Sequence, residues 1–141
     1  MNISRLKHSF AVASKMKDFI ASHQEYSDAT KEDMFYLGIL HDIAYEFVDT
    51  QLEHEQIGGS ILRDNGYKYW QEVYNHGNPD SIYTSKELDL LNYMDLITGP
   101  NGENFSIEQR LADIAMRYGA NSIQYKKAEK LSRIIKTVFS L

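Results

Sequence analysis

The sequence predicts an all-α fold, a compact bundle of about six or seven helices. Apolar residues recur at steps of three and four along most of the chain, which is the period of one helix face. The only two prolines, Pro79 and Pro100, lie between the periodic segments and so leave those segments free to be helical. A length of 141 residues suits one continuous core, and we expect a single domain over residues 1–141.

The composition excludes several classes of protein. Apolar residues make up 43% and charged residues 25%, as in ordinary soluble domains. The absence of Cys excludes disulfide scaffolds, thiolate nucleophiles and iron–sulfur clusters, and leaves His, Asp and Glu as the strong metal ligands. A net charge of −5 argues against a long nucleic acid as partner. Neither an apolar leader nor a run of roughly 18 apolar residues occurs, so we expect a cytoplasmic protein with no membrane partner.

The first predicted helix runs from Ile3 to about Ser22 and carries apolar residues on two faces. A helix with two apolar faces is usually packed inside a domain, so we expect this helix to be central. Its main face consists of Leu6, Phe10, Ala13, Met16 and Ile20, and its second face carries His8, Val12 and Phe19.

A second helix is predicted to follow the caps Asp28 and Thr30 and to end near Val48. A third helix, with Ile57, Ile61 and Leu62 on one face, is closed by 65–66, an Asn-Gly pair suited to the left-handed position after a helix. The aromatic segment 67–74 follows. Its Tyr, Trp and Val residues also favour a strand, and we predict a short helix.

Three later helices are predicted from their capping signals. Residues 84–87, Thr to Glu, have the spacing of a capping box and precede an apolar stripe that includes Leu88 and Leu91. Residues 106–109, Ser to Gln, form another capping box, and the helix after it is stopped by Gly119. Asn121 or Ser122 caps a basic helix that runs to the C-terminus. That helix packs on the core or, as the alternative, forms a homodimer contact.

Several polar residues interrupt the apolar faces, and burying a polar group without a partner costs roughly 2 kcal/mol or more. Each residue alone has a structural interpretation, because a single His on an apolar face is commonly a core residue bonded to a backbone carbonyl. Together, inward imidazoles and carboxylates stay unsatisfied unless a cation gathers them, and they suit iron, manganese, zinc or cobalt. The residues are His8, His41, Asp42, His54, His76 and Asp95, whereas His23 is predicted to lie on the surface.

The segment 38–44, which contains the adjacent pair His41 and Asp42, resembles the HD superfamily of all-α metal-dependent phosphohydrolases. The more specific feature is an ordered set, His8, then His41-Asp42, then Asp95, which is similar to the family's H…HD…D pattern over roughly residues 1–118. This resemblance implies that these four residues hold one metal ion.

Two further histidines resemble those of HD proteins that hold two metal ions. His54 opens the segment His-Glu-Gln-Ile-Gly-Gly, and His76 lies in Asn-His-Gly. The resemblance implies that Asp42 bridges to a second ion held by these histidines. The layout is similar to that of bacterial hydrolases that cleave dinucleoside tetraphosphates symmetrically, whereas 95–102 resembles a set of uncharacterised bacterial HD proteins.

The resemblance implies hydrolysis of a small phosphorylated molecule, a nucleotide or a dinucleoside polyphosphate, by attack of a metal-bound hydroxide. The cofactor is expected to be one or two divalent transition-metal ions per chain, with iron or manganese favoured over zinc, cobalt, nickel or magnesium. His41 and Asp42 are the expected catalytic residues, with Glu46 as the candidate general base one helical turn after Asp42.

Other interpretations of the same residues remain open. Some HD proteins with a six-ligand set are di-iron oxygenases, and a non-catalytic module that binds a nucleotide or a metal ion is a third possibility. Lys7, Arg63 and Arg110 are candidates to complete the charge around a phosphate, and each is otherwise a solvated surface cation.

Overall fold

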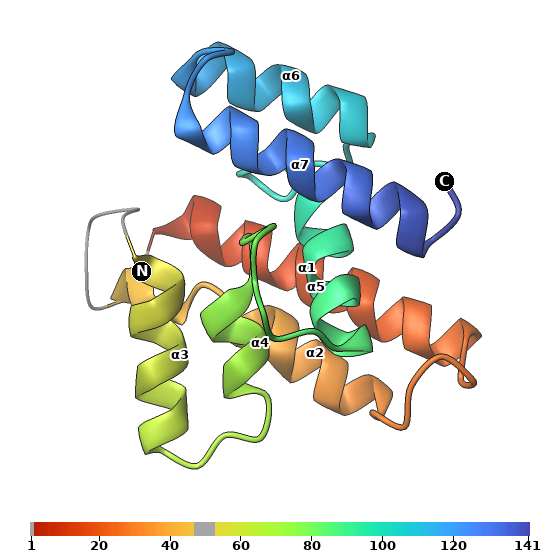
Figure 1. Ribbon diagram of the computed structural model, residues 1–141. Coiled ribbons are helices and arrows are strands. Elements are labelled where there is room, and N and C mark those ends of the chain that lie inside the picture. The colour runs from red at the N-terminus through yellow and green to blue at the C-terminus, as the bar shows by residue number, and fades with distance from the viewer. Residues whose placement is uncertain (1, 47–52) are drawn as a thin grey trace.

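The computed structural model describes residues 2–46 and 53–141, with Glu46 described by its backbone alone, and contains no strand in these ranges. The all-α prediction is therefore confirmed, and Figure 1 shows the arrangement of the helices. The elements are α1 (Ile3–Ser22), α2 (Lys31–Leu40), the 3-10 helix η1 (Ile43–Glu46), α3 (His54–Asp64), α4 (Trp70–Asn75), α5 (Lys86–Leu96), α6 (Ile107–Tyr118) and α7 (Ile123–Val138).

Helix α1 crosses the middle of the molecule and packs against both α2 and α5 (Figure 1). The main core lies between these helices and includes the fully buried side chains of Val12, Met34 and Leu91. The predicted apolar face of α1 is covered only in part, because Leu6 and Phe10 are 49% and 56% exposed. Helix α2 has half as many residues as α1 and is too short to cover it along its whole length.

Two glycines bring pairs of helices into direct backbone contact. A Cβ atom on Gly38 of α2 would lie 2.4 Å from the Cα atom of Ala13 on α1. A Cβ atom on Gly59 of α3 would lie 2.4 Å from the Cβ atom of Tyr74 on α4. The α1–α2 and α3–α4 pairs therefore pack closer than any larger side chain at these positions permits.

The second helix ends at Leu40, earlier than the predicted end near Val48, which lies outside the described residues. Its start is confirmed, since Thr30 caps α2 in a capping box. The ring of His41 donates to the carbonyl oxygen of Gly38 at 2.6 Å, on the last turn of the helix. The chain then turns through Asp42 into η1, and this turn positions both side chains of the pair.

Helix α5 begins one residue later than the predicted capping box, because Ser85 and not Thr84 is the cap. The Ser85 hydroxyl accepts from the backbone N–H of Leu88 and donates to the buried carboxylate of Glu72 on α4. The hydrogen bond between Ser85 and Glu72 favours Ser85 as the cap, and it also links α4 to α5.

The other predicted elements agree with the structure. The aromatic segment contains the helix α4, Gly66 takes the left-handed conformation after α3, and Ser106 forms the predicted capping box of α6. Ser122 caps α7. Helices α6 and α7 form a hairpin that packs on the end of α5 (Figure 1). A second, smaller core lies between this hairpin and α5 and contains Leu96, Ile107, Leu131 and Ile135. Of the described helices, none is long and apolar enough to cross a membrane.

Candidate metal centre

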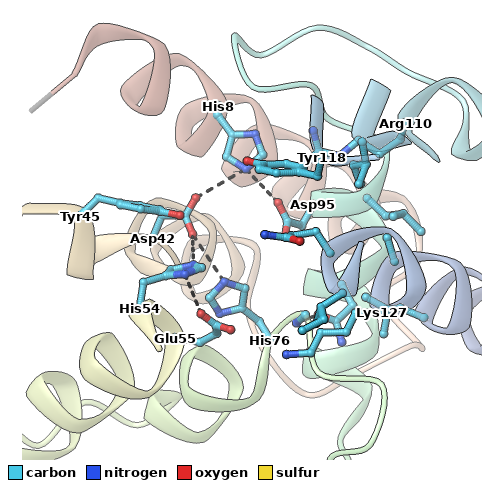
Figure 2. Close-up of a pocket in the computed structure, with 18 of the residues that line it drawn as sticks. His8, Asp42, Tyr45, His54, Glu55, His76, Asp95, Arg110, Tyr118 and Lys127 are labelled. Atoms are coloured by element: carbon cyan, nitrogen blue, oxygen red, sulfur yellow. Dashed lines mark hydrogen bonds and ion pairs between the residues drawn. The ribbon is translucent and has the colours of Figure 1, made fainter. Parts of the chain in front are cut away.

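The six polar residues singled out in the sequence converge at one cavity, although they come from separate segments. Figure 2 shows five of them, and His41 lies beside Asp42 between α2 and η1. His8 comes from α1, His54 is the first residue of α3, His76 follows α4, and Asp95 lies in α5.

Asp42 occupies the middle of this cluster, and its two carboxylate oxygens face different histidines. Oδ2 lies 3.3 Å from Nε2 of His41 and 3.7 Å from Nε2 of His8. Oδ1 lies 3.2 Å from Nε2 of His54 and 3.5 Å from Nε2 of His76. The Asp42 carboxylate therefore separates the four imidazoles into two pairs.

Asp95 adds a second carboxylate to the pair formed by His8 and His41. Its Oδ1 atom lies 2.8 Å from Nε2 of His8 and 3.5 Å from Nε2 of His41. Two sets of three donor atoms lie within 4.8 Å of one another, one from His8, His41 and Asp95 and the other from His41, Asp42 and His76. Both sets have the spacing and the nitrogen and oxygen donors that suit a divalent transition-metal ion.

Each imidazole is held through its Nδ1 atom, so that Nε2 faces the cluster. Nδ1 donates to the carbonyl oxygen of Gly99 in His8 (2.9 Å), of Gly38 in His41 (2.6 Å) and of Val73 in His76 (2.6 Å). In His54, Nδ1 lies 2.6 Å from a carboxylate oxygen of the neighbouring Glu55. These acceptors fix the ring orientation and the tautomer that metal-binding histidines require.

One atom of the cluster lies near carboxylates but forms no hydrogen bond with a described residue. The Nε2 atom of His41 is buried and has no hydrogen-bond partner among the described residues, and the whole residue is only 1% exposed. A buried polar atom of this kind costs free energy unless something binds it. A cation between His41 and the two carboxylates satisfies this atom, so the residues present fit a metal ion.

The charges of the cluster reinforce one another. Burial by itself lowers the pKa of His41, but Asp42 and Asp95 raise this pKa well above its usual value. Burial also lowers the pKa of His54, but Asp42 and Glu55 outweigh this effect and raise the pKa to about 10. Although burial favours the neutral acid, histidine contacts hold the pKa of Asp42 and of Asp95 well below the usual range. Without a metal ion, the cluster therefore pairs imidazolium groups with carboxylates.

The loop after α5 supports the first pair of histidines. Besides the bond from His8 to Gly99, the ammonium group of Lys15 on α1 donates to the carbonyl oxygen of Ile97 at 2.9 Å and to the hydroxyl of Thr98 at 2.8 Å. Thr98 is fully buried. Two residues of α1, His8 and Lys15, therefore hold this loop against the helix.

A stack of three side chains supports the second pair. The ring of Tyr45 in η1 lies between His54, at 4.6 Å between ring centroids, and Arg5, whose guanidinium carbon lies 3.8 Å from the ring centroid. Tyr45, Glu55 and Lys15 were not identified from the sequence. Only Glu55 carried a usable signal, its place directly after His54.

The cluster opens into a cavity of about 390 Å³, with His8, Asp42, His54, His76 and Asp95 in its lining. Arg110 lines the cavity as well, whereas Lys7 and Arg63 do not. Arg63 lies over the ring of Trp70, and Lys7 is exposed. The side chain of Glu46, the predicted general base, lies outside the described part of the structure. His23 is exposed and stacks on Phe19, as predicted for a surface residue.

A comparison with protein-family models finds a match to the model described as HD domain, over residues 5–121. The matched range contains all six convergent residues and ends before α7 begins. No curated protein and no solved structure matches the chain.

Proposed function

The chain belongs to the HD-domain family, and on that premise we propose that it is a metal-dependent phosphohydrolase that cleaves a small phosphorylated molecule, either a nucleotide or a dinucleoside polyphosphate. The family and the buried His/Asp cluster together suggest metal-dependent phosphohydrolysis. The choice of a nucleotide as the substrate class rests on the similarity to the six-ligand HD hydrolases.

The observation that carries this proposal is the division of the Asp42 carboxylate between two pairs of imidazoles. In the proposed site, His8, His41, Asp42 and Asp95 would hold one ion. His54 and His76, together with Asp42, would hold a second. A carboxylate that faces two ligand sets in this way is suited to bridge two ions.

When bound, such ions act as Lewis acids toward phosphoryl oxygens and lower the pKa of a bound water molecule toward neutrality. The residues of the chain orient the reaction. The carbonyl groups that hold Nδ1 of His8, His41 and His76 keep Nε2 of these rings directed at Asp42 and Asp95, whose carboxylates balance the charge. Glu46 is the candidate general base, because it lies four residues after Asp42 in the sequence.

The test measures metal content and phosphate release on the same preparations. We expect one or two iron or manganese ions per chain in the purified protein, and release of phosphate from at least one member of a panel of nucleotides and dinucleoside polyphosphates. Asp42→Asn keeps the size of the side chain and removes its charge, so it should lose metal and activity together. His23→Ala, at an exposed histidine remote from the cavity lining, is the matched control and should change neither.

Other outcomes select other functions. Oxygen consumption without phosphate release would replace the proposal by a di-iron oxygenase. Tight nucleotide binding without turnover, whichever metal is added, would replace it by a regulatory module.

A further inference from the structure

The cavity has a second wall that does not come from the metal-binding segments. Helix α6 presents Arg110, Ile114 and Tyr118 to it at a spacing of four residues, and α7 presents Ile123, Lys127 and Leu131 at the same spacing. Residues four apart lie on one helix face, so the hairpin turns a continuous face of each helix toward the metal centre.

This wall carries two cations, Arg110 and Lys127. Arg110 and Lys127 both line the cavity, and neither forms an ion pair within the described ranges. The Nε atom of Arg110 is buried and lacks a hydrogen-bond partner among the described residues. Figure 2 shows both cations across the cavity from Tyr45 and His54. Arg110 therefore brings to the cavity wall a guanidinium group with one unsatisfied nitrogen, and such a group is suited to bind an anionic ligand.

The same wall also leaves apolar surface in contact with water. Ile123 is 71% exposed and Tyr118 is 41% exposed, although both line the cavity. Large apolar side chains at the rim of a polar cavity commonly take up the apolar part of a ligand.

We propose, building on the function proposed above, that the α6–α7 hairpin is the substrate-recognition wall: Arg110 and Lys127 bind the anionic oxygens of the phosphoryl group, and Ile123 and Tyr118 cover an aromatic or apolar body attached to it. The substrate class is then a small phosphate ester with an aromatic or apolar group. A cavity of about 390 Å³ lies toward the small end of the range for ligand sites, roughly 300–1,000 Å³, and so favours one compact ester group. Lys127 and Ile123 lie beyond the range of the family match.

The test uses two phosphonates that cannot be hydrolysed, so that binding is measured apart from turnover. Methylphosphonate and phenylphosphonate are titrated by calorimetry into the metal-loaded protein. We expect the phenyl compound to bind about tenfold more tightly, which corresponds to removing roughly 60 Å² of apolar surface from water. Ile123→Ser should abolish this preference. Met116→Ser, at an 80% exposed apolar position of α6 outside the cavity lining, should retain it.

The charge is tested separately. Lys127→Ala should weaken both phosphonates by about tenfold, whereas the neighbouring Lys126→Ala, at an exposed lysine outside the cavity lining, should leave both unchanged. Arg110→Gln should weaken both, and Arg110→Lys should restore part of the binding because the charge is kept.

Equal binding by wild type, Lys127→Ala and Ile123→Ser would overturn the recognition wall. This result is distinct from failure of the proposed function, in which the phosphonates bind in the residue-dependent way described but no phosphate ester is cleaved.

Discussion

His8 and Gly99, 91 residues apart in the chain, are joined by a hydrogen bond in which Nδ1 of His8 donates to the Gly99 carbonyl oxygen at 2.9 Å. Because a carbonyl oxygen only accepts, the bond fixes the proton on Nδ1 and leaves Nε2 to face Asp95. The loop after α5 is therefore part of the candidate metal centre, although no side chain of residues 97–102 lines the cavity.

The first prediction concerns the seating of this loop on α1. Gly102 has a φ of +84°, and a Cβ atom there would lie 2.9 Å from the carbonyl oxygen of Lys7. Gly102→Ala should lower the free energy of unfolding by about 2–3 kcal/mol, because it adds a steric clash to the strain of a left-handed conformation. In Gly66→Ala the φ is +75° and nothing lies within 4 Å, so only the strain remains, about 1 kcal/mol. Urea denaturation measures both, and equal losses would contradict the close contact with α1.

The second prediction separates the two proposed ions. His54→Ala removes a donor from the second pair only, so the protein should lose about one metal ion per chain and keep the other. His8→Ala should instead deplete the ion held with Asp95. Elemental analysis after dialysis measures the content. Loss of all metal in His54→Ala would show that the two ligand sets do not bind independently.

The third prediction concerns Glu55, whose carboxylate lies 2.6 Å from Nδ1 of His54. Glu55→Gln should weaken the second ion by about tenfold to a hundredfold, because such a carboxylate orients the ring and raises its basicity. Competition with a chelator measures the affinity. Asp64→Asn removes an exposed carboxylate from the other end of the same helix and serves as the control. Equal effects of the two variants would assign the change to net charge and not to His54.

The fourth prediction is a pH dependence of metal binding. The pKa of His54 is raised to about 10 and that of His41 well above its usual value, so both rings are protonated at pH 7 in the metal-free protein. A metal ion binds the neutral ring and releases its proton, so the metal affinity should increase with pH by about tenfold per unit for each proton released, and the contribution of His54 should level off above pH 10. Calorimetry in buffers of different ionisation enthalpy counts the protons. An affinity independent of pH between 6 and 9 would contradict the shifts.

The same pKa shifts predict that the stability of the metal-free protein decreases as the pH rises. Because the folded pKa of His54 exceeds the unfolded value of 6.5, its protonation stabilises the metal-free protein fully below pH 6.5. This contribution is lost as the pH rises toward 10. Urea denaturation of the metal-free protein at pH 6 and pH 9 should therefore show lower stability at pH 9, with the difference reduced in His54→Ala.

The sequence was sufficient for features that depend on neighbouring residues. The capping box at Ser106 and the glycine after α3 are local signals, and both are found as predicted. The six polar residues on apolar faces could also be identified, because an inward polar group is conspicuous against its neighbours. The structure brings these six residues together, and their role as metal ligands stays a prediction.

Features that depend on distant parts of the chain were missed. The end of α2 at Leu40 coincides with the turn that places His41 and Asp42 in the cluster, whereas the apolar pattern alone favoured a helix up to about Val48. The cap at Ser85 depends on Glu72 of another helix. Lys127 is one of several lysines on a basic amphipathic helix, and only the packing of that helix against the cavity distinguishes it from its neighbours.

The order of the segments along the chain separates two tasks. All six convergent residues occur by Asp95, and the wall formed by α6 and α7 begins only at Ile107. With the recognition wall that we propose, substitutions in the hairpin change which molecule binds in the cavity and leave the residues of the candidate metal centre unchanged. Exchange of residues 107–138 between related chains should transfer substrate preference without transferring metal affinity, which makes this hairpin the natural place for divergence and for redesign.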